Sequence, residues 1–349
     1  MPLKCRDHEN RIIHSFDLSP EAWLSLGQDN RKRGHLFTAC CNSPVSLKHS
    51  HLGTQFFAHK VRRACAWAPE TEFHLRLKQL AIEVARENGW QAEPEVPGQT
   101  PSGEQWKADV LAQKGNLKVA IEIQWSGQTE KETYRRQEGY KQSGVRCLWL
   151  MRRCGFVPNK ETPAVEIVDT PDGDFTALIG RSDQKTAIPI RDLLNASFQK
   201  RFRFGVPLGI RANVSVSTGT MTCWKCRAET RIISSVDIQF GTHIRRFPVA
   251  ECEKYMDLFS AILSSLSPKL KIGTIKSRYS KALEVSYLSN GCFHCDALID
   301  NGYEHEAGYG PVISYYGPVI SYPEIEISER WRQAIIADGS FEFGWGIYE

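Results

Sequence analysis

The feature that most constrains the fold is a pair of short apolar runs, at residues 106–112 and 117–125, joined by a Lys-Gly-Asn turn. This pattern predicts a β-hairpin. The first run carries Asp109, and the second carries Glu122 and Gln124. Because strand side chains alternate between faces, Glu122 and Gln124 point to the same side. An acid within Val-Ala-Ile-Glu-Ile is costly to bury unless something pairs with it.

Two acids on neighbouring strands suit a hard divalent cation. Carboxylate oxygens are the ligands that Mg²⁺ prefers, and a Mg²⁺ site of this kind predicts metal-assisted hydrolysis of a phosphodiester. The alternative is a structural one, in which the buried Glu122 pairs with an arginine of the following helix, such as Arg135 or Arg136.

The segments around the hairpin alternate between helical and strand patterns. An amphipathic helix is predicted at 70–88, with one apolar face. A strand is expected at 90–96, a polar helix at 129–142 and a buried strand at 146–151. The order α-β-β-β-α-β predicts an α/β fold.

The 349 residues allow two or three domains. We expect a Cys/His-rich segment at 1–68 and the α/β core at 69–157. Residues 158–174 are rich in Pro, Asp and Thr, so 158–204 is predicted to be a linker followed by a helix. The remaining 205–349 is expected to be an α+β domain that contains a zinc ribbon.

Five short stretches carry a resemblance to a known family. They are Glu72-Phe-His74, Lys107-Ala-Asp109-Val, Ile121-Glu-Ile-Gln124-Trp-Ser126, Arg136-x-x-x-Tyr140 and Leu148-Trp-Leu, preceded by Phe57-Ala-His59 with Cys41 and Cys65. The pattern resembles the competence protein CoiA-like family of the PD-(D/E)XK nuclease superfamily, over about residues 35–152. This resemblance implies an αβββαβ restriction-endonuclease-like core.

The resemblance also implies roles for individual residues. Asp109 and Glu122 would bind Mg²⁺ or Mn²⁺, and Glu72 would approach them from the helix. Gln124 completes the catalytic set, but it stands where the superfamily carries lysine, so it can only orient the attacking water. Lys107, on the same strand face as Asp109, would then provide the positive charge.

Two functions follow from these expectations. One is a Mg²⁺-dependent DNA nuclease that acts in competence, recombination or defence against foreign DNA, alone or with protein partners in such a complex. The other is a DNA-binding accessory factor with a degenerate nuclease core that binds DNA without cutting it. The Gln124 substitution favours the second function.

Two Cys-x-x-Cys pairs predict a tetrahedral Zn²⁺ site of the ribbon kind. Their cysteines are Cys223, Cys226, Cys292 and Cys295. The long stretch between the pairs exceeds ordinary ribbon spacing, which predicts an inserted subdomain. Two unrelated pairs of reduced cysteines are the alternative.

A second, smaller zinc site is expected from Cys41, His59 and Cys65, with Cys40 or His35 as the fourth ligand. Packed cysteines beside a hydrogen-bonded histidine are the alternative. The chain has no apolar signal-peptide core and no apolar run long enough to span a membrane, so a cytoplasmic location is expected.

Positive charge is concentrated in the first half of the chain. Residues 1–160 hold 24 Lys and Arg against 17 Asp and Glu, whereas the whole chain has a net charge of +4. A basic region around an acidic site fits a polyanion substrate, and a solvated basic surface is the alternative. The predicted DNA contacts are Arg62, Arg63, Lys107, Arg135, Arg136 and Tyr140.

Overall fold

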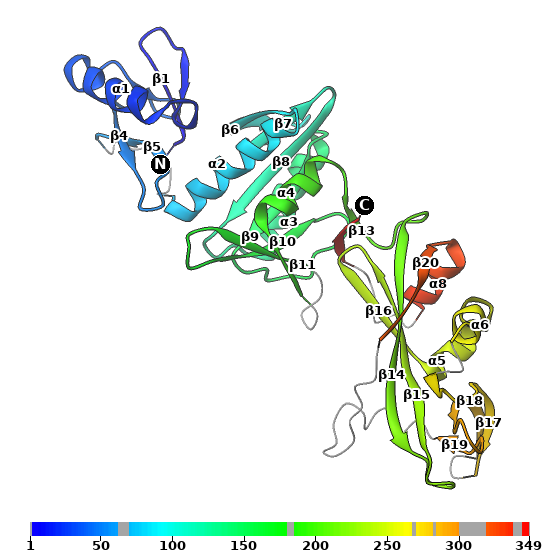
Figure 1. Cartoon of the computed structure of the whole chain (residues 1–349). Helices are drawn as coiled ribbons and strands as arrows, with labels where there is room; N and C mark the ends of the chain where they lie inside the picture. The colour runs from blue at the N-terminus through cyan, green and yellow to red at the C-terminus, as the bar shows by residue number, and fades with distance from the viewer. Residues whose placement is uncertain are drawn as a thin grey trace. The chain divides into compact units, whose positions relative to one another are not determined.

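The computed structural model describes residues 2–61, 70–179, 185–266, 270–281, 284–299, 319–337 and 344–348. The chain divides into two compact units, Met1–Phe204 and Gly205–Glu349 (Figure 1). Three predicted site residues, Arg62, Arg63 and Cys65, lie outside the described residues. None of the helices in the described part combines the length and the apolarity that a membrane span requires.

The first unit begins with short strands and one helix. In chain order these are β1 (Lys4–Arg6), β2 (Ile12–His14), η1 (Ser15–Asp17), α1 (Pro20–Arg33), β3 (Phe37–Thr38), β4 (Val45–His49) and β5 (Gln55–His59). β1 lies between β2 and β3, and β4 pairs with β5. Helix α1 starts at Pro20 because the Ser19 hydroxyl accepts a hydrogen bond from the Ala22 amide. Trp23 and Phe57 pack at the centre of this part.

A seven-stranded sheet forms the rest of the first unit, in the order β12-β11-β10-β9-β8-β7-β6. The elements of this part are α2 (Glu72–Glu87), β6 (Gln91–Gln99), β7 (Gln105–Lys114), β8 (Leu117–Gln124), α3 (Glu130–Gln142), β9 (Arg146–Met151), β10 (Ala164–Asp169), β11 (Phe175–Ile179), β12 (Thr186–Pro189), α4 (Ile190–Phe198) and β13 (Phe202–Phe204). β6, β7 and β8 are antiparallel, whereas β9 runs parallel to β8. The predicted mixed α/β class is confirmed.

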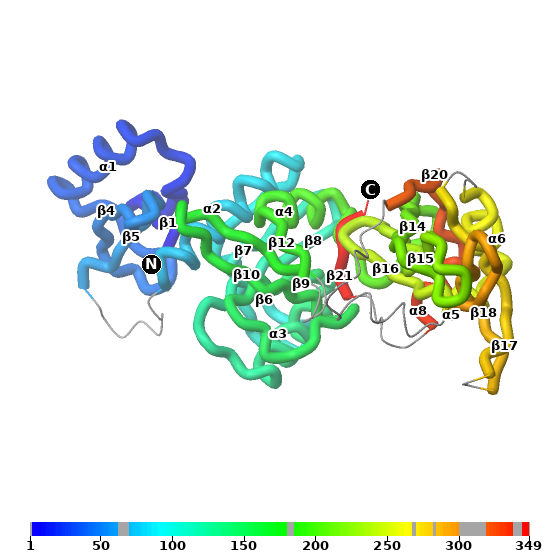
Figure 2. The backbone as a smooth tube through the Cα atoms, turned by 60° about the horizontal axis from the view of Figure 1, so that its bottom comes forward, coloured from blue at the N-terminus to red at the C-terminus, as the bar shows by residue number. Residues whose placement is uncertain are grey.

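Helices cover both faces of this sheet. α2 and α4 lie on one face and α3 lies on the other (Figure 2). The side chain of Asn88, just after α2, donates a 2.8 Å hydrogen bond to Asn195 of α4. α2 buries Leu77, Leu80 and Val84 on its inner side, as its apolar spacing predicts. The two helices that precede and follow the hairpin therefore approach its acids from opposite sides.

The linker predicted for residues 158–174 is wrong over β10, and β11 begins directly after that range at Phe175. These strands extend the large sheet, with β10 parallel to β9 and antiparallel to β11. Val165, Ile167, Phe175 and Ala177 are buried. The Pro-, Asp- and Thr-rich composition misled the prediction because the polar residues belong to the connections, while the strands themselves are short and apolar.

The second unit is built on a long β-hairpin. Its elements are β14 (Arg211–Thr222), β15 (Glu229–Phe240), β16 (His243–Pro248), α5 (Val249–Cys252), η2 (Glu253–Tyr255), α6 (Met256–Ser264), β17 (Lys276–Ser280), β18 (Val285–Gly291), β19 (Leu298–Ile299), β20 (Ile320–Glu326), α8 (Glu329–Ile336) and β21 (Trp345–Ile347). β16-β15-β14-β20 form one sheet and β17-β18-β19 form another. Val236, Phe247, Phe259 and Trp331 belong to the core of this unit.

Candidate active site and metal centres

The hairpin opens at the position of its two acids. The β7–β8 ladder ends at the pair Val110–Ile121, one step before Asp109 and Glu122 would face each other. Instead, the Asp109 carboxylate accepts a 3.0 Å hydrogen bond from the amide of Ile123. The Asp109 side chain thus replaces the carbonyl that would otherwise accept from the Ile123 amide. β7 and β8 stop pairing where the two acids lie.

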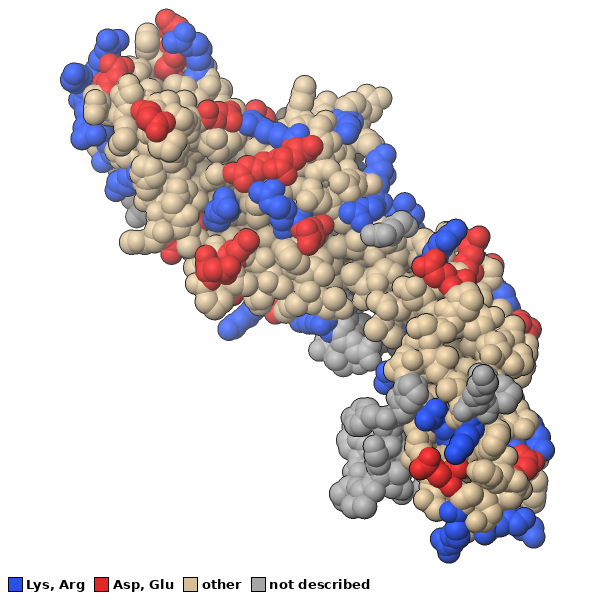
Figure 3. Space-filling view, viewed as in Figure 1, with Lys and Arg blue, Asp and Glu red and all other residues tan. Residues whose placement is uncertain are grey.

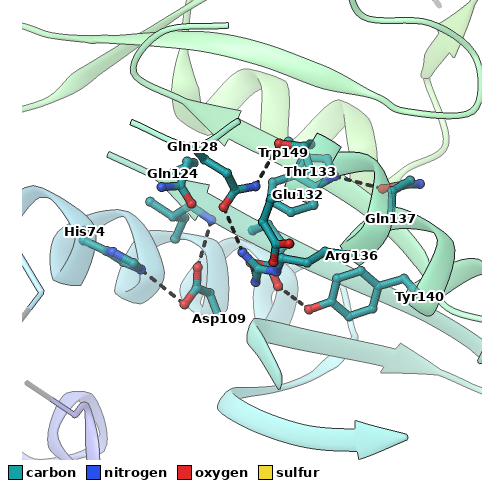
Figure 4. Close-up of polar contacts among 12 residues, drawn as sticks. His74, Asp109, Gln124, Gln128, Glu132, Thr133, Arg136, Gln137, Tyr140 and Trp149 are labelled. Atoms are coloured by element: carbon teal, nitrogen blue, oxygen red, sulfur yellow. Dashed lines mark hydrogen bonds and ion pairs between the residues drawn. The ribbon is translucent and has the colours of Figure 1, made fainter. Parts of the chain in front are cut away.

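Asp109 is surrounded by side chains that face it from α2 and β6. His74 Nε2 lies 3.2 Å from Asp109 Oδ1 (Figure 4). Lys78 Nζ lies 3.7 Å from the same oxygen. Lys78 Nζ also lies 2.8 Å from Glu70 Oε1 and 3.2 Å from Glu95 Oε1. We call these five residues the Asp109 cluster. It places three carboxylates around one fully buried ammonium group.

Charge pairing sets the protonation states of this cluster. Burial alone would raise the pKa of Asp109, but His74, Lys78 and the Ile123 amide outweigh it and hold that pKa well below its usual value. Burial alone would lower the pKa of Lys78, but the carboxylates of Glu95, Glu70 and Asp109 outweigh it and raise that pKa. At neutral pH, Asp109 is therefore a carboxylate and Lys78 an ammonium.

The backbone of β6 is strained at this cluster. Glu95 has a φ of +55°, a left-handed conformation that side chains other than glycine rarely adopt. Its side chain is buried against Lys78. Backbone strain of this kind costs on the order of 1–3 kcal/mol and persists only where the surrounding structure holds it in place. The Glu95 carboxylate accepts a 3.2 Å hydrogen bond from Lys78 Nζ, which helps to hold this conformation.

Three members of the Asp109 cluster can hold a metal ion. Glu70, His74 and Asp109 each offer one ligand atom, and these atoms all lie within 4.8 Å of one another. Glu70 Oε2 is buried and has no hydrogen-bond partner among the described residues. Neither Glu72 nor Glu122 belongs to this group. A buried carboxylate oxygen without a hydrogen-bond donor is available to coordinate a cation.

Glu122 faces α3 instead. The hydroxyl of Tyr140 and the guanidinium of Arg136 both donate to its carboxylate, and both contacts are short (Figure 4). Arg136 also donates to Gln128 at 3.3 Å and lies over the ring of Trp149. This is the arrangement that the structural alternative expected for Glu122, with Arg136 as its partner.

The protonation of Glu122 is poised near neutral pH. Burial and the nearby Asp109 carboxylate raise its pKa to about 8, against the opposing effect of Arg136 and Tyr140. Its side chain is 1% exposed. With its pKa raised to about 8, Glu122 is mainly protonated at neutral pH.

Two of the predicted catalytic residues hydrogen-bond to groups other than the two acids. Glu72 Oε2 accepts a 3.1 Å hydrogen bond from the His51 amide, so this side chain contacts the N-terminal part of the unit. Gln124 Nε2 donates to the Ser126 carbonyl at 2.8 Å and to its hydroxyl at 3.2 Å. The helix residues that do meet Asp109 are His74 and Lys78.

The predicted DNA contacts within the described residues are largely engaged with protein groups. Arg135 pairs with Glu132 and Glu104 at an exposed position, and Lys107 is half-buried, which lowers its pKa. Tyr140 is 0% exposed, so its predicted contact with DNA is wrong. A side chain that is completely enclosed positions Glu122 and cannot reach a phosphate.

Both acids lie in one recognisable segment of the chain. A family model described as competence protein CoiA, nuclease-like domain, matches residues 70–164. The span starts at Glu70, in the Asp109 cluster, and ends at the first residue of β10. The chain carries a CoiA nuclease-like domain. The family resemblance predicted from the hairpin and its flanking helices is confirmed.

The other comparisons add little to the CoiA nuclease-like domain. A crystal structure of the protein of unknown function AF1548 is 16% identical, and the match covers 23% of this chain and 47% of that chain with a TM-score of 0.18. The match therefore spans less than half of the AF1548 chain. No curated protein matches the chain.

Outside the CoiA nuclease-like domain, the four cysteines of the second unit come together. Cys223 Sγ lies 3.7 Å from Cys295 Sγ, and Cys226 Sγ lies 3.6 Å from Cys292 Sγ. A tetrahedral zinc site with Zn–S bonds of about 2.3 Å has sulfur–sulfur edges of about 3.8 Å. The four thiols therefore have the spacing of a Cys₄ site and can hold a metal such as zinc.

A smaller cluster lies in the N-terminal part of the first unit. His59 Nε2 is 3.3 Å from Cys41 Sγ and 3.6 Å from Cys40 Sγ. These three residues can also hold a metal. Cys40, one of the two residues considered as a fourth ligand, is thus placed at the cluster. Cys65, the remaining predicted ligand, lies outside the described residues.

Glu70, Lys78 and Glu95 are not among the site residues predicted from the sequence, and His74 had no predicted role of its own. The spacing of Glu70, His74 and Lys78 could have indicated three of these residues. Positions 70, 74 and 78 are four residues apart and would share one face of a helix. No local signal marks Glu95, which reaches the cluster from β6.

Proposed function

We propose that the CoiA nuclease-like domain hydrolyses phosphodiester bonds of DNA, with a divalent cation held by Glu70, His74 and Asp109. The observation that carries the proposal is the convergence of these three donors, one of which has a buried oxygen without a hydrogen-bond partner among the described residues. The activity would serve DNA processing, in competence, recombination or defence.

In this proposal the cation provides Lewis-acid activation of water and of the phosphate. Asp109 is its central ligand, since its depressed pKa keeps the carboxylate ionised. Thr71 accepts a hydrogen bond from the His74 amide, which fixes the first turn of α2 and holds the imidazole toward Asp109. Glu70 completes the set with its free oxygen.

The donor set favours Mn²⁺ over Mg²⁺. Mg²⁺ prefers oxygen ligands and binds few protein side chains, whereas an imidazole nitrogen suits transition metals better. Two carboxylates with one histidine form a mixed set that Mn²⁺ accepts. We therefore propose that Mn²⁺ supports cleavage at lower concentration than Mg²⁺ does.

We assign the positive charge near the metal to Lys78 rather than to Lys107. Lys78 Nζ lies 3.7 Å from Asp109 Oδ1 and its raised pKa keeps it charged. The superfamily carries a lysine where this chain has Gln124. Lys78, on α2, would supply the positive charge that such a lysine provides from the strand.

The test compares two neighbouring glutamates. The full chain would be assayed on plasmid, linear and single-stranded DNA with Mn²⁺ or Mg²⁺. We expect Glu70→Gln, His74→Ala and Asp109→Asn to abolish cleavage, whereas the matched control Glu72→Gln should retain it. Mn²⁺ binding measured by calorimetry should be lost in the same three variants. Equal loss in Glu72→Gln would contradict the assignment of the ligands.

A second candidate function is DNA binding without cleavage. It is favoured by Gln124, which donates to Ser126, and by Glu122, which is held by Arg136 and Tyr140. In that case the wild-type chain would cut none of the substrates with either cation, while it would still bind DNA with a strong dependence on salt.

For the second unit, we propose that Cys223, Cys226, Cys292 and Cys295 bind one structural Zn²⁺. Four thiolates at tetrahedral spacing form a closed site with no position for a substrate. Beneath them, Met221, Ile232 and Ile299 pack into a small apolar cluster that the ion would hold together.

A further inference from the structure

The two Cys-x-x-Cys turns of the second unit have the same geometry. In the first, the Arg227 amide donates to the Cys223 carbonyl at 3.0 Å, and in the second the Asp296 amide donates to the Cys292 carbonyl at 2.9 Å. Arg227 and Asp296 also share a left-handed backbone, with φ of +62° and +54°. We call these turns the two knuckles.

Each knuckle presents an aromatic residue followed by a basic residue between its cysteines. These pairs are Trp224-Lys225 in the first knuckle and Phe293-His294 in the second, and all four residues are exposed. Trp224 is 56% exposed and Phe293 is 41% exposed. We call the four residues, together with the exposed Arg227, the knuckle surface. Two exposed aromatic side chains on paired turns form an apolar surface that a ligand can contact.

The aromatic residues are held in place by the fold. The indole nitrogen of Trp224 donates a 2.9 Å hydrogen bond to the Leu298 carbonyl, and the Phe293 amide donates a 2.9 Å hydrogen bond to Thr230 Oγ1. Because the polar edge of Trp224 is already bonded, its exposed face is fixed and apolar. A ligand that stacks on it would lose little additional side-chain entropy.

Positive charge accompanies these rings. Neither Lys225 nor Arg227 forms an ion pair with any residue in the described part of the chain. The nearby Asp296 is instead paired with Lys276 and Arg278. Lys and Arg side chains lie at the tip of the second unit where the β14–β15 turn is drawn (Figures 1 and 3). The knuckle surface is therefore cationic as well as aromatic.

We propose that the knuckle surface binds single-stranded DNA, whose bases stack on Trp224 and Phe293 while its phosphates contact Lys225 and Arg227. Base faces are available for stacking only when they are unpaired, and a cationic surface with fixed rings matches a strand that offers both bases and phosphates. The proposal goes beyond the nuclease function because it gives the chain a second DNA contact, outside the CoiA nuclease-like domain.

The test measures binding in the absence of cleavage. Fluorescence anisotropy of a labelled oligothymidylate would be followed with the full, zinc-loaded chain carrying Asp109→Asn, without Mg²⁺ or Mn²⁺. We expect Trp224→Ala and Phe293→Ala each to weaken binding about fivefold or more, since stacking contributes roughly 1–3 kcal/mol per base. Trp224→Phe keeps a ring and should retain most of the affinity.

The remaining experiments test the contribution of charge and the preference for single-stranded over duplex DNA. Lys225→Gln with Arg227→Gln should lower the salt dependence of single-strand binding by about 0.7 in log–log slope for each lost contact. Arg332→Gln, on α8 and paired with Glu329, is the matched control and should leave the slope unchanged. A duplex of the same length should bind more weakly. The affinity for this duplex should be unchanged by Trp224→Ala.

Two outcomes would overturn the proposal. One is single-strand affinity that stays within twofold of the parent chain in both alanine variants, with zinc content and melting unchanged; this would leave a protein partner as the occupant of the surface. The other is an equal loss of duplex and single-strand binding, which would rule out stacking. Cleavage by the wild-type chain is measured separately, so failure of either proposal is recognised independently.

Discussion

His74 Nε2 lies 3.2 Å from Asp109 Oδ1, which joins the first turn of α2 to the point where β7 and β8 separate. α2 and the β7–β8 hairpin are separate segments of the chain. This contact places His74 of the helix beside Asp109 of the hairpin. It also distinguishes the two acids of the hairpin, because Asp109 interacts with α2 and Glu122 with α3.

Removing the buried ammonium group of the Asp109 cluster should destabilise the chain strongly. Lys78→Met keeps the length of the side chain but leaves Glu70, Glu95 and Asp109 without their shared counter-ion. Loss of one partner from a buried ion pair costs about 3–5 kcal/mol, and we expect a loss of that size in the free energy of unfolding, measured with urea.

The matched control for this variant is Arg76→Met on the same helix, where the side chain is 32% exposed and its ion pair with Glu83 is 4.0 Å long. It should change stability by no more than about 0.5 kcal/mol. A loss for Lys78→Met no larger than that of the control would show that the cluster is not held by Lys78.

Glu122 should make stability fall as the pH rises. Its pKa is raised from 4.5 to about 8 by burial and by Asp109. Between these values the folded chain keeps a proton that the unfolded chain has lost, so protonated Glu122 stabilises the fold at low pH and this contribution disappears as the pH rises through 8. The slope is at most about 1.4 kcal/mol per pH unit.

Glu122→Gln removes this titration, so its free energy of unfolding should vary less with pH than that of the wild type. Urea denaturation at several pH values between 4.5 and 8 measures the difference. Glu138→Gln, at an exposed position of α3, serves as the control and should follow the wild-type curve. Parallel curves for Glu122→Gln and wild type would contradict the raised pKa.

The cysteines of the knuckles should control zinc content in the second unit. Cys223→Ser and Cys292→Ser are each expected to lower the zinc measured by mass spectrometry by one equivalent per chain, and to lower the melting temperature, because zinc binding contributes to folding. Cys252→Ser, in the same unit but outside the cluster, should keep its zinc. Zinc loss without any change in melting would argue against a structural role.

The N-terminal cluster should hold a second zinc ion. Cys41 and His59 are 3.3 Å apart at Sγ and Nε2, so Cys41→Ser and His59→Ala should each remove one further equivalent. His51→Ala, an exposed histidine of the neighbouring turn, provides the control. Unchanged zinc content in both test variants would favour the alternative of packed cysteines beside a hydrogen-bonded histidine.

The sequence by itself determined the elements whose signals are local. The apolar spacing of α2, the hairpin turn, the polar helix α3 and the apolar run of β9 all lie where periodicity predicts them. The family followed from the same stretch, since its motifs are read along the chain. The spacing of the paired Cys-x-x-Cys motifs likewise indicated a cluster of four thiols.

Only the tertiary structure decided which groups each acid meets. β10 and β11 join the sheet although their connections resemble a linker, because pairing with β9 depends on contacts distant in sequence. Asp109 and Glu122 have different direct partners because α2 and α3 pack on opposite faces of the sheet (Figure 2). Glu95 reaches Lys78 only through the strained backbone of β6. Such convergence depends on long-range packing, which local patterns along the chain do not encode.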